Sequence, residues 1–357
     1  MIRLHSPWVL LLLLVGCSDS PEPATAAVSD SEPSPEVSTA EGSNVGDCGN
    51  GTDDDDNGLT DCDDPACEGA PDCEEDSSPD PEDTGEAETI HPSEVQFKFL
   101  SAGFTHVCGL DLLGKAYCWG GNEDGQSLVL DQTYTALSSG GTHTCAAQVD
   151  GPMDCWGKGY DDGLVSVPDA NFWDVMSGGM ASCGISFDGE FLCWGGEDAG
   201  PVLSPPEGAV FFDASMGGSH GCGLTDNEEV LCWGENDQNQ TDVPEISDMV
   251  VSVSSGGHHS CALTDRYEVI CWGSDEYGQS SPPPDQQFMS ISMGFVHSCG
   301  ITRTEQVLCW GGLPDSEAVN PPSGAFERVS AGGDHTCALD SEGQVTCWGA
   351  IDWGDTP

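Results

Sequence analysis

Basic residues are scarce in this chain of 357 residues. Seven Lys and Arg stand against 63 Asp and Glu, which gives a formal net charge of -56. Nucleic acids and anionic lipid headgroups are bound mainly through clustered Lys and Arg, so this composition excludes nucleic acid as a partner. Cations, basic proteins and uncharged glycans remain compatible with such a surface.

Long apolar runs are also missing, apart from one near the N-terminus. Residues 8–15 are apolar, and the run is too short to cross a bilayer as a helix. It ends in Leu14-Val15-Gly16-Cys17, which resembles a bacterial lipobox. We therefore expect a lipoprotein signal peptide over 1–16 and lipidation of Cys17, with an ordinary signal peptide as the alternative. The expected location is extracytoplasmic, with the membrane reached by the lipid anchor only, and Ser18 favours the outer membrane or the cell surface.

The sequence has none of the common catalytic motifs. It contains no Gly-rich phosphate loop, no Gly-x-Ser-x-Gly, no His-Glu-x-x-His and no Cys-x-x-Cys pair of the kind that holds zinc. No carboxylate pair stands out from the acidic background. We therefore predict no catalytic residues and expect that the protein is not an enzyme.

Lys and Arg are absent from residues 18–93, which are rich in Pro, Ser, Thr, Gly and acidic residues. A stretch with few apolar groups and much like charge cannot offset its chain entropy by burial. We predict a largely disordered acidic tether, with linkers at 17–46 and 74–93, that precedes the folded part of the chain.

One segment of this tether, 47–73, has a specific pattern. Oxygen-bearing side chains and a glycine follow the spacing of a calcium loop. The predicted ligands are Asp53, Asp55, Asn57, the carbonyl of Leu59, Asp61 and Asp64. The surrounding cysteines are expected to form two disulfides of open connectivity: Cys48, Cys62, Cys67 and Cys73. Calcium is thus the one expected cofactor, and a merely solvated acidic run is the alternative.

The rest of the chain, 94–357, repeats itself. Seven cysteine pairs have members ten positions apart, and Trp-Gly follows every second cysteine. The pairs are Cys108/Cys118, Cys145/Cys155, Cys183/Cys193, Cys222/Cys232, Cys261/Cys271, Cys299/Cys309 and Cys337/Cys347. A period of about 38 residues indicates stacked supersecondary units. Ten-residue spacing on facing strands predicts one cross-strand disulfide in each unit.

Each unit is expected to contain three clear strands, and the pattern leaves a short fourth open. In the last copy they cover 326–331, 335–339 and 344–349, and Gly343 closes the hairpin turn with a positive φ. Glu228, Tyr267 and Glu305 stand at the equivalent place in three other copies, so we expect those turns to differ. The strand at 95–100 is a candidate to complete the blade at the other end of the chain.

The repeated pattern Val-Ser-x-Gly-Gly-x-His-x-Cys-Ala-Leu, Gly-x-Val-x-Cys-Trp-Gly resembles the regulator of chromosome condensation repeat family. Gly125-Gln126 and Gly278-Gln279 add its last element in two copies. The resemblance implies an all-β, seven-bladed β-propeller over 94–357, and a β-solenoid is the alternative. It also implies binding of other proteins through loops on one face, as in exported bacterial members, one of which is a β-lactamase inhibitor.

Residues that recur in every unit are expected to be structural. The repeated Trp should pack between blades, and the six repeated His, which Ala181 replaces in the third copy, should bond to neighbouring backbone. Trp173 and Trp353 fall outside the pattern and are candidates for a contact surface.

The sequence predicts a scaffold or inhibitor that binds a protein through the variable loops after each Trp-Gly. The alternative is an extracellular glycan-processing enzyme, adhesin or lectin that uses the axial face.

Overall fold

The computed structural model describes residues 92–149, 151–158 and 166–351, all of which belong to the unit 85–357. The predicted signal peptide, Cys17, the acidic linkers up to residue 91, the 47–73 segment with its calcium loop and four cysteines, and Trp353 lie outside the described residues.

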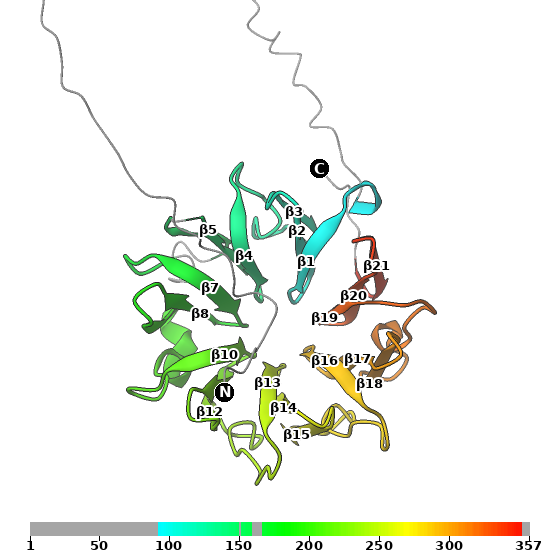
Figure 1. Cartoon of the computed structure of the whole chain (residues 1–357). Coiled ribbons are helices and arrows are strands. Elements are labelled where there is room, and N and C mark those ends of the chain that lie inside the picture. The colour runs from blue at the N-terminus through cyan, green and yellow to red at the C-terminus, as the bar shows by residue number, and fades with distance from the viewer. Residues whose placement is uncertain (1–91, 150, 159–165, 352–357) are drawn as a thin grey trace, which may run out of the picture. The chain divides into compact units, whose positions relative to one another are not determined.

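The described residues form a seven-bladed β-propeller. Each blade is an antiparallel sheet of three strands that are consecutive in the chain, and the described residues add no fourth strand to any of these sheets. Figure 1 shows the blades around a central axis, with the first strand of each blade nearest the centre.

The strands are β1 (Phe97–Ala102), β2 (His106–Asp111), β3 (Ala116–Gly120), β4 (Tyr134–Ser139), β5 (His143–Gln148), β6 (Met153–Gly157), β7 (Phe172–Ser177), β8 (Ala181–Ser186), β9 (Phe191–Gly195), β10 (Phe211–Met216), β11 (His220–Thr225), β12 (Val230–Gly234), β13 (Val250–Ser255), β14 (His259–Thr264), β15 (Val269–Gly273), β16 (Phe288–Met293), β17 (His297–Thr302), β18 (Val307–Gly311), β19 (Arg328–Ala331), β20 (His335–Leu339) and β21 (Val345–Gly349).

Three short 3-10 helices complete the described elements: η3 (Pro92–Glu94), η4 (Glu197–Leu203) and η5 (Glu317–Val319). Over residues 92–149, 151–158 and 166–351, no helix has the length and apolarity to cross a membrane. The predicted all-β class and seven-bladed architecture are confirmed.

The register of each outer hairpin places its two cysteines opposite each other. In the last blade Cys337 faces Cys347 and Leu339 faces Val345. All seven predicted repeat disulfides are present, with Cα–Cα distances of 4.0–4.1 Å, and each links the second and third strands of a single blade. The bonds join Cys108 to Cys118, Cys145 to Cys155, Cys183 to Cys193, Cys222 to Cys232, Cys261 to Cys271, Cys299 to Cys309 and Cys337 to Cys347.

The two cysteines of a bond differ in exposure, which the repeat alone does not reveal. The first cysteine is fully buried in every blade, because the second strand lies between its two neighbours. The second cysteine lies on the third strand, at the edge of the sheet. Cys118 is still buried there, and the other six are only partly buried: Cys155, Cys193, Cys232, Cys271, Cys309 and Cys347.

The expectation that three of the hairpin turns differ is wrong. Gly343 has a φ of 76°, and Glu228, Tyr267 and Glu305 have φ values of 66°, 67° and 61°. Glu228 N–H donates to Thr225, as Gly343 N–H donates to Asp340. The backbone of these three residues adopts the left-handed conformation, which glycine adopts more readily. The strand register on either side therefore imposes the turn type.

The free edge of the first strand is capped by the neighbouring blade in six of the seven blades. Serine Oγ atoms accept backbone N–H groups of the next first strand at 2.8–3.1 Å, as Ser101 does from Ser139 and Ser330 does from Ala102. Unpaired backbone donors at a sheet edge need such partners. Met176 holds this position in the third blade and offers no hydroxyl to the fourth.

The ring closes by packing of the seventh blade on the first. The suggestion that the strand at 95–100 completes the last blade is wrong, because β1 pairs with β2 in its own blade. Phe97 N–H donates to the Gly343 carbonyl at 2.8 Å, and Leu100 and Leu339 share one buried cluster. The joint between the chain ends therefore repeats the contact made between consecutive blades.

Candidate binding site on the loop face

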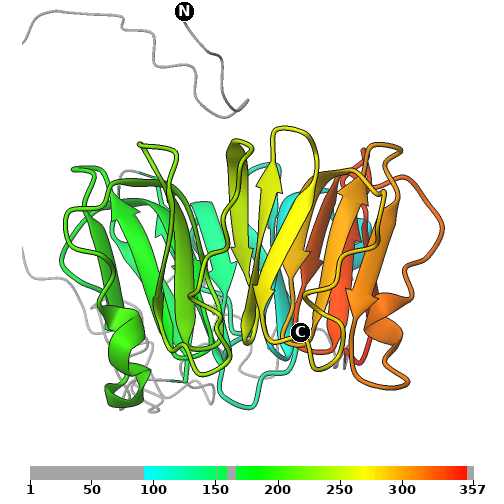
Figure 2. The same cartoon turned by 90° about the horizontal axis from the view of Figure 1, so that it is seen from below.

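One face of the propeller carries both the turns between the first and second strands and the loops that follow Trp-Gly. We call it the loop face, and we call the other, with the turns between the second and third strands, the hairpin face. In six blades the residue after Trp-Gly donates its N–H to the carbonyl of the residue three positions before the first cysteine, for example Gly121 to Thr105 and Ala350 to Asp334. The helical turns η4 and η5, green and orange in Figure 2, lie at this same end.

A closed ring of backbone hydrogen bonds surrounds the axis on the loop face. The turn between the first and second strands of each blade begins with Gly-Gly or, in two blades, Gly-Phe. The second residue of this pair donates its N–H to the carbonyl of the first residue of the next pair, at 2.9–3.2 Å. The donors and acceptors are Phe104 to Gly140, Gly141 to Gly178, Gly179 to Gly217, Gly218 to Gly256, Gly257 to Gly294, Phe295 to Gly332 and Gly333 to Gly103. A Cβ on Gly140 would lie 2.6 Å from the Gly178 carbonyl oxygen, so the approach of the blades requires glycine there.

Two phenylalanines break this repeat. Phe104 and Phe295 stand where the other five blades have the second glycine. Their side chains are 46% and 38% exposed, although the glycine before each of them is buried. The two rings meet edge to face, with centroids 5.0 Å apart, and the His258 ring lies 6.0 Å from Phe295.

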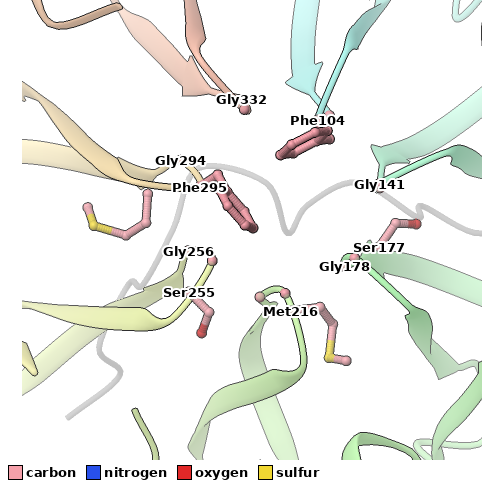
Figure 3. A pocket seen from close by; sticks show the side chains of 18 of the residues that line it. Phe104, Gly141, Ser177, Gly178, Met216, Ser255, Gly256, Gly294, Phe295 and Gly332 are labelled. Atoms are coloured by element: carbon pink, nitrogen blue, oxygen red, sulfur yellow. The ribbon is translucent and has the colours of Figure 1, made fainter. Parts of the chain in front are cut away.

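The two phenylalanines lie at the axis. Figure 3 shows both rings projecting into the central opening between the turns of the seven blades. The opening is a cavity of about 390 Å³ lined by the Gly-Gly turns and the last residues of the first strands, including Met216 and Met293. We call this opening the neck, and its wall is mainly apolar.

A wider cavity of about 1040 Å³, which we call the vestibule, adjoins this neck on the loop face. Phe104, His258, Phe295 and Gly333 line both cavities. A site of this size can hold several side chains or a small ligand.

Three loops of similar structure form much of the vestibule wall. Each has a buried glutamine whose side-chain oxygen accepts the backbone N–H two residues earlier, at 2.8–2.9 Å. These glutamines are Gln126, Gln240 and Gln279. The folded loops place three acidic residues at the same loop position, and all three line the vestibule: Glu123, Asp237 and Glu276.

The vestibule wall is negatively charged. Asp124 and Asp334 add to the three carboxylates above, and no Lys or Arg is among the described residues that line it. Lys158 is the only basic residue in the loops that connect successive blades. A hydrogen bond from the Gln240 amide holds the pKa of Asp237 below its usual value, so this carboxylate stays ionised near neutral pH.

The six repeated histidines are fully buried and link blades together. In five of them the ring Nε2 contacts a hydroxyl of the next blade at 2.7–2.8 Å, for example His106 with Thr144 and His297 with Thr336. The structural role is confirmed, but this partner is a side-chain hydroxyl rather than the backbone that we expected. Between the third and fourth blades this contact is absent. Ala181 replaces the histidine of the third blade, and Gly221 replaces the hydroxyl residue of the fourth.

The relay extends to the repeated tryptophans. Thr144 donates its hydroxyl proton to the Gln126 carbonyl, which also accepts Nε1–H of Trp156 at 2.9 Å. The same pattern joins Thr336 and Trp348 to the Ala318 carbonyl. The Trp and His of the repeat are therefore parts of the blade interfaces, and neither is available to a substrate.

Burial keeps these histidines neutral. Loss of solvent lowers the pKa of His106 and His259 to about 3, and that of His143, His220, His297 and His335 to about 4. Within the described ranges, no three His, Cys, Asp or Glu side chains are grouped so that they could hold a metal ion.

The cysteines predicted to form the repeat disulfides belong to the blades and not to this site. None of them lines the neck or the vestibule. This holds for the buried members, Cys108, Cys145, Cys183, Cys222, Cys261, Cys299 and Cys337, and for their partners, Cys118, Cys155, Cys193, Cys232, Cys271, Cys309 and Cys347. Their role is to hold the hairpins that carry the loops, so they shape the site only indirectly.

The structure places the predicted surface residue Trp173 away from this site. It is 43% exposed near the start of β7, whereas the other end of that strand lines the neck through Ser177. Sequence reasoning missed Phe104, Phe295 and His258. The signal was present as a departure from the repeat, since Phe replaces the second glycine of the motif in only two of seven copies.

Comparison with known proteins shows which repeat four stretches of the chain are similar to. Four stretches, 97–126, 213–240, 250–279 and 326–350, match the regulator of chromosome condensation (RCC1) repeat. No curated protein matches the chain.

Solved structures share the fold at low sequence identity. The CRINKLY WD40 ectodomain of the Arabidopsis thaliana receptor kinase ACR4 is 22% identical, with 71% of this chain and 95% of that chain covered and a TM-score of 0.61. The entire ectodomain of the Physcomitrella patens receptor kinase CR4 is 21% identical, with 71% and 73% covered and a TM-score of 0.61. Prp20p from Saccharomyces cerevisiae, described with its binding properties to Gsp1p and histones, is 16% identical, with 72% and 83% covered and a TM-score of 0.56.

Proposed function

Because the chain is a seven-bladed propeller built of RCC1 repeats, we propose that it is a protein-binding scaffold or inhibitor whose binding surface is the centre of the loop face. The observation that carries this proposal is the exposed Phe104–Phe295 pair at the axis. Aromatic side chains that stay exposed on a rigid surface are typical anchors of protein interfaces.

The place of action follows from the disulfides and the sequence. Seven disulfides are typical of proteins that fold outside the reducing cytosol. We propose that a lipid on Cys17 holds the protein at a bacterial membrane and that the acidic tether, with calcium bound in the 53–64 loop, displays the propeller away from it. Inhibition of an exported enzyme is one form that such binding could take.

The proposal assigns no catalytic residue. The repeated histidines are buried and neutral, and the buried glutamines of the vestibule loops are bonded within those loops. An extracellular glycan-processing enzyme or a lectin that uses the axial opening is the alternative, and the experiment below includes it.

The test is a pull-down from envelope and culture fluid with the oxidised chain as bait. The variant Phe104→Gly/Phe295→Gly restores the glycine of the other five blades and leaves the backbone ring intact, so it should fold. The control Leu112→Ser/Leu113→Ser changes two exposed apolar residues on the hairpin face. A stoichiometric protein that is retained by wild type and control but lost by the Phe variant supports the proposal. Retention by all three, or turnover or retention of a polysaccharide in place of a protein, overturns it.

A further inference from the structure

We propose that the vestibule receives a cationic side chain, Arg or Lys, that projects from a loop of the partner protein. This inference rests on the proposed function and names the chemistry by which the site recognises its partner. The cation would lie against the Phe104–Phe295 pair and within reach of the carboxylates of Glu123, Asp237 and Glu276.

The vestibule combines the two features that a protein-borne cation needs. Aromatic faces attract cations through the ring quadrupole, and the attraction is stronger where solvent is excluded. Carboxylates around the cavity add an electrostatic attraction, and salt screens it because Glu123, Asp237 and Glu276 are exposed. Here the aromatic pair lies where the neck and the vestibule meet, and acidic residues from three loops line the wider part.

Other occupants fit this cavity less well. An anionic ligand would be repelled by the carboxylates of the wall, and the described lining has no Lys or Arg to offset them. The chain's own segment 18–93 has no Lys or Arg to place there. A second copy of the chain would bring its own large excess of carboxylates to the vestibule, because 63 acidic residues stand against seven Lys and Arg in each copy. Charge complementarity therefore selects a basic loop of a different protein.

A single inserted side chain also fits the presence of phenylalanine in place of glycine in only two blades. The first and sixth blades are separated by the seventh, and the two rings reach over its turn to contact each other at 5.0 Å. The result is one asymmetric apolar surface at the axis of an otherwise repetitive ring. A single inserted side chain needs one such surface, whereas seven equivalent aromatics would fill the neck.

The test uses defined probes and the full oxidised chain. Acetyl-Gly-Gly-Arg-Gly-Gly-amide is titrated by ligand-observed NMR, and the same peptide with citrulline in place of Arg is the neutral control. We expect the Arg peptide to bind at least about fivefold more tightly than the citrulline peptide at low salt, with the difference falling as salt is raised.

Variants locate the site. Phe104→Gly/Phe295→Gly and Glu123→Gln/Asp237→Asn/Glu276→Gln should each weaken the Arg peptide about tenfold, which corresponds to about 1.4 kcal/mol. The control Asp188→Asn/Glu190→Gln/Glu342→Gln makes the same change in net charge at exposed hairpin-face turns and should stay within about twofold. Equal binding of the two peptides, or equal losses in control and vestibule variants, overturns the inference. If the peptide fails while the Phe variant still loses the protein partner, the proposed function stands and the cation is rejected.

Discussion

At the scale of single residues, the repeated histidines show how a polar group becomes part of a core. Each ring contacts a hydroxyl of the next blade, except where Val107 faces His335 and where Ala181 and Gly221 replace both members. In one blade pair both members are replaced, whereas at the joint between the seventh and first blades only the hydroxyl is lost and His335 Nε2 is left without a hydrogen-bond partner. A buried donor left without its acceptor costs about 1–3 kcal/mol.

Removing the hydroxyl in one blade and adding it at the equivalent position of another tests the contact between histidine and hydroxyl. Thr144→Val removes the hydroxyl opposite His106 and should lower the free energy of unfolding by about 1–3 kcal/mol. Val107→Thr offers a hydroxyl to His335 and should leave the stability unchanged or raise it. The measurement is the midpoint of urea unfolding. Equal losses in the two variants would show that the hydroxyl contributes nothing specific.

The same histidines predict the pH dependence of stability. Their folded pKa values, about 3 to 4, lie below the ordinary value of 6.5, so the unfolded chain binds more protons as the pH falls from 6.5. Each should remove about 1.4 kcal/mol of stability per pH unit in that window. Burial raises the pKa of Asp174 and Asp213 to about 6, which opposes the loss between pH 6 and 3.8.

Six histidines outweigh two aspartates, so stability should fall from pH 6.5 toward pH 4. Urea midpoints measured at half-unit steps check this, and His143→Ala should make the fall shallower by about 1.4 kcal/mol per unit. A midpoint that is constant over this range, or that rises as the pH falls, contradicts the assignment of neutral buried histidines.

At the scale of the blade, a three-stranded sheet and one disulfide form the unit. The first cysteine of every pair is fully buried and the hairpin it closes is short. By the chain-entropy estimate, such a loop contributes about 2.5–3 kcal/mol through the unfolded state. The blade also depends on its neighbours. Across the interfaces the repeated Trp Nε1 and His Nε2 are hydrogen-bonded in five blades each, and the free strand edge is capped in six.

Removal of one disulfide tests the contribution of the crosslink. Cys261→Ala/Cys271→Ala should fold and lose about 2–5 kcal/mol of unfolding free energy, with the other six disulfides intact. The measurement is urea unfolding under oxidising conditions, with a free-thiol assay to confirm that no pair has exchanged. An unchanged midpoint would show that packing alone specifies the hairpin.

Much of the blade was predictable from the repeat, and the turn and the site were not. Cysteine spacing and Trp-Gly specify the register of the outer hairpin, so the pairing of Cys337 with Cys347 follows from the sequence. The turns at Glu228, Tyr267 and Glu305 were mispredicted because local propensity yields to the register of two strands held by a disulfide. The vestibule was missed because it joins residues of several blades, and only the closed ring brings them together.

At the scale of the whole molecule, closure of the ring gives every blade two neighbours to pack against. The seventh and first blades share a buried cluster with Leu339, and consecutive blades share similar clusters, such as the one with Leu263. The two leucines are 2% and 3% exposed at equivalent positions. If the interface between the seventh and first blades is as stable as the interfaces between consecutive blades, the ring has no weak joint.

Leu339→Ala and Leu263→Ala compare the closing joint with a sequential one. Both should lose about 2–5 kcal/mol, because each leaves a cavity that the rigid blades cannot fill. Thermal and urea unfolding provide the comparison. A loss below about 0.5 kcal/mol for Leu339→Ala, beside a full loss for Leu263→Ala, would show that the ring opens between its ends.

The loop face is the surface that we propose a protein partner covers. Site-specific photo-crosslinking in the native envelope tests this most directly, with p-benzoylphenylalanine placed at Phe104 on the loop face or at Leu113 on the hairpin face. We predict a discrete crosslinked product from position 104 and none from position 113. A product from position 113 alone would contradict the account and assign the partner to the opposite face.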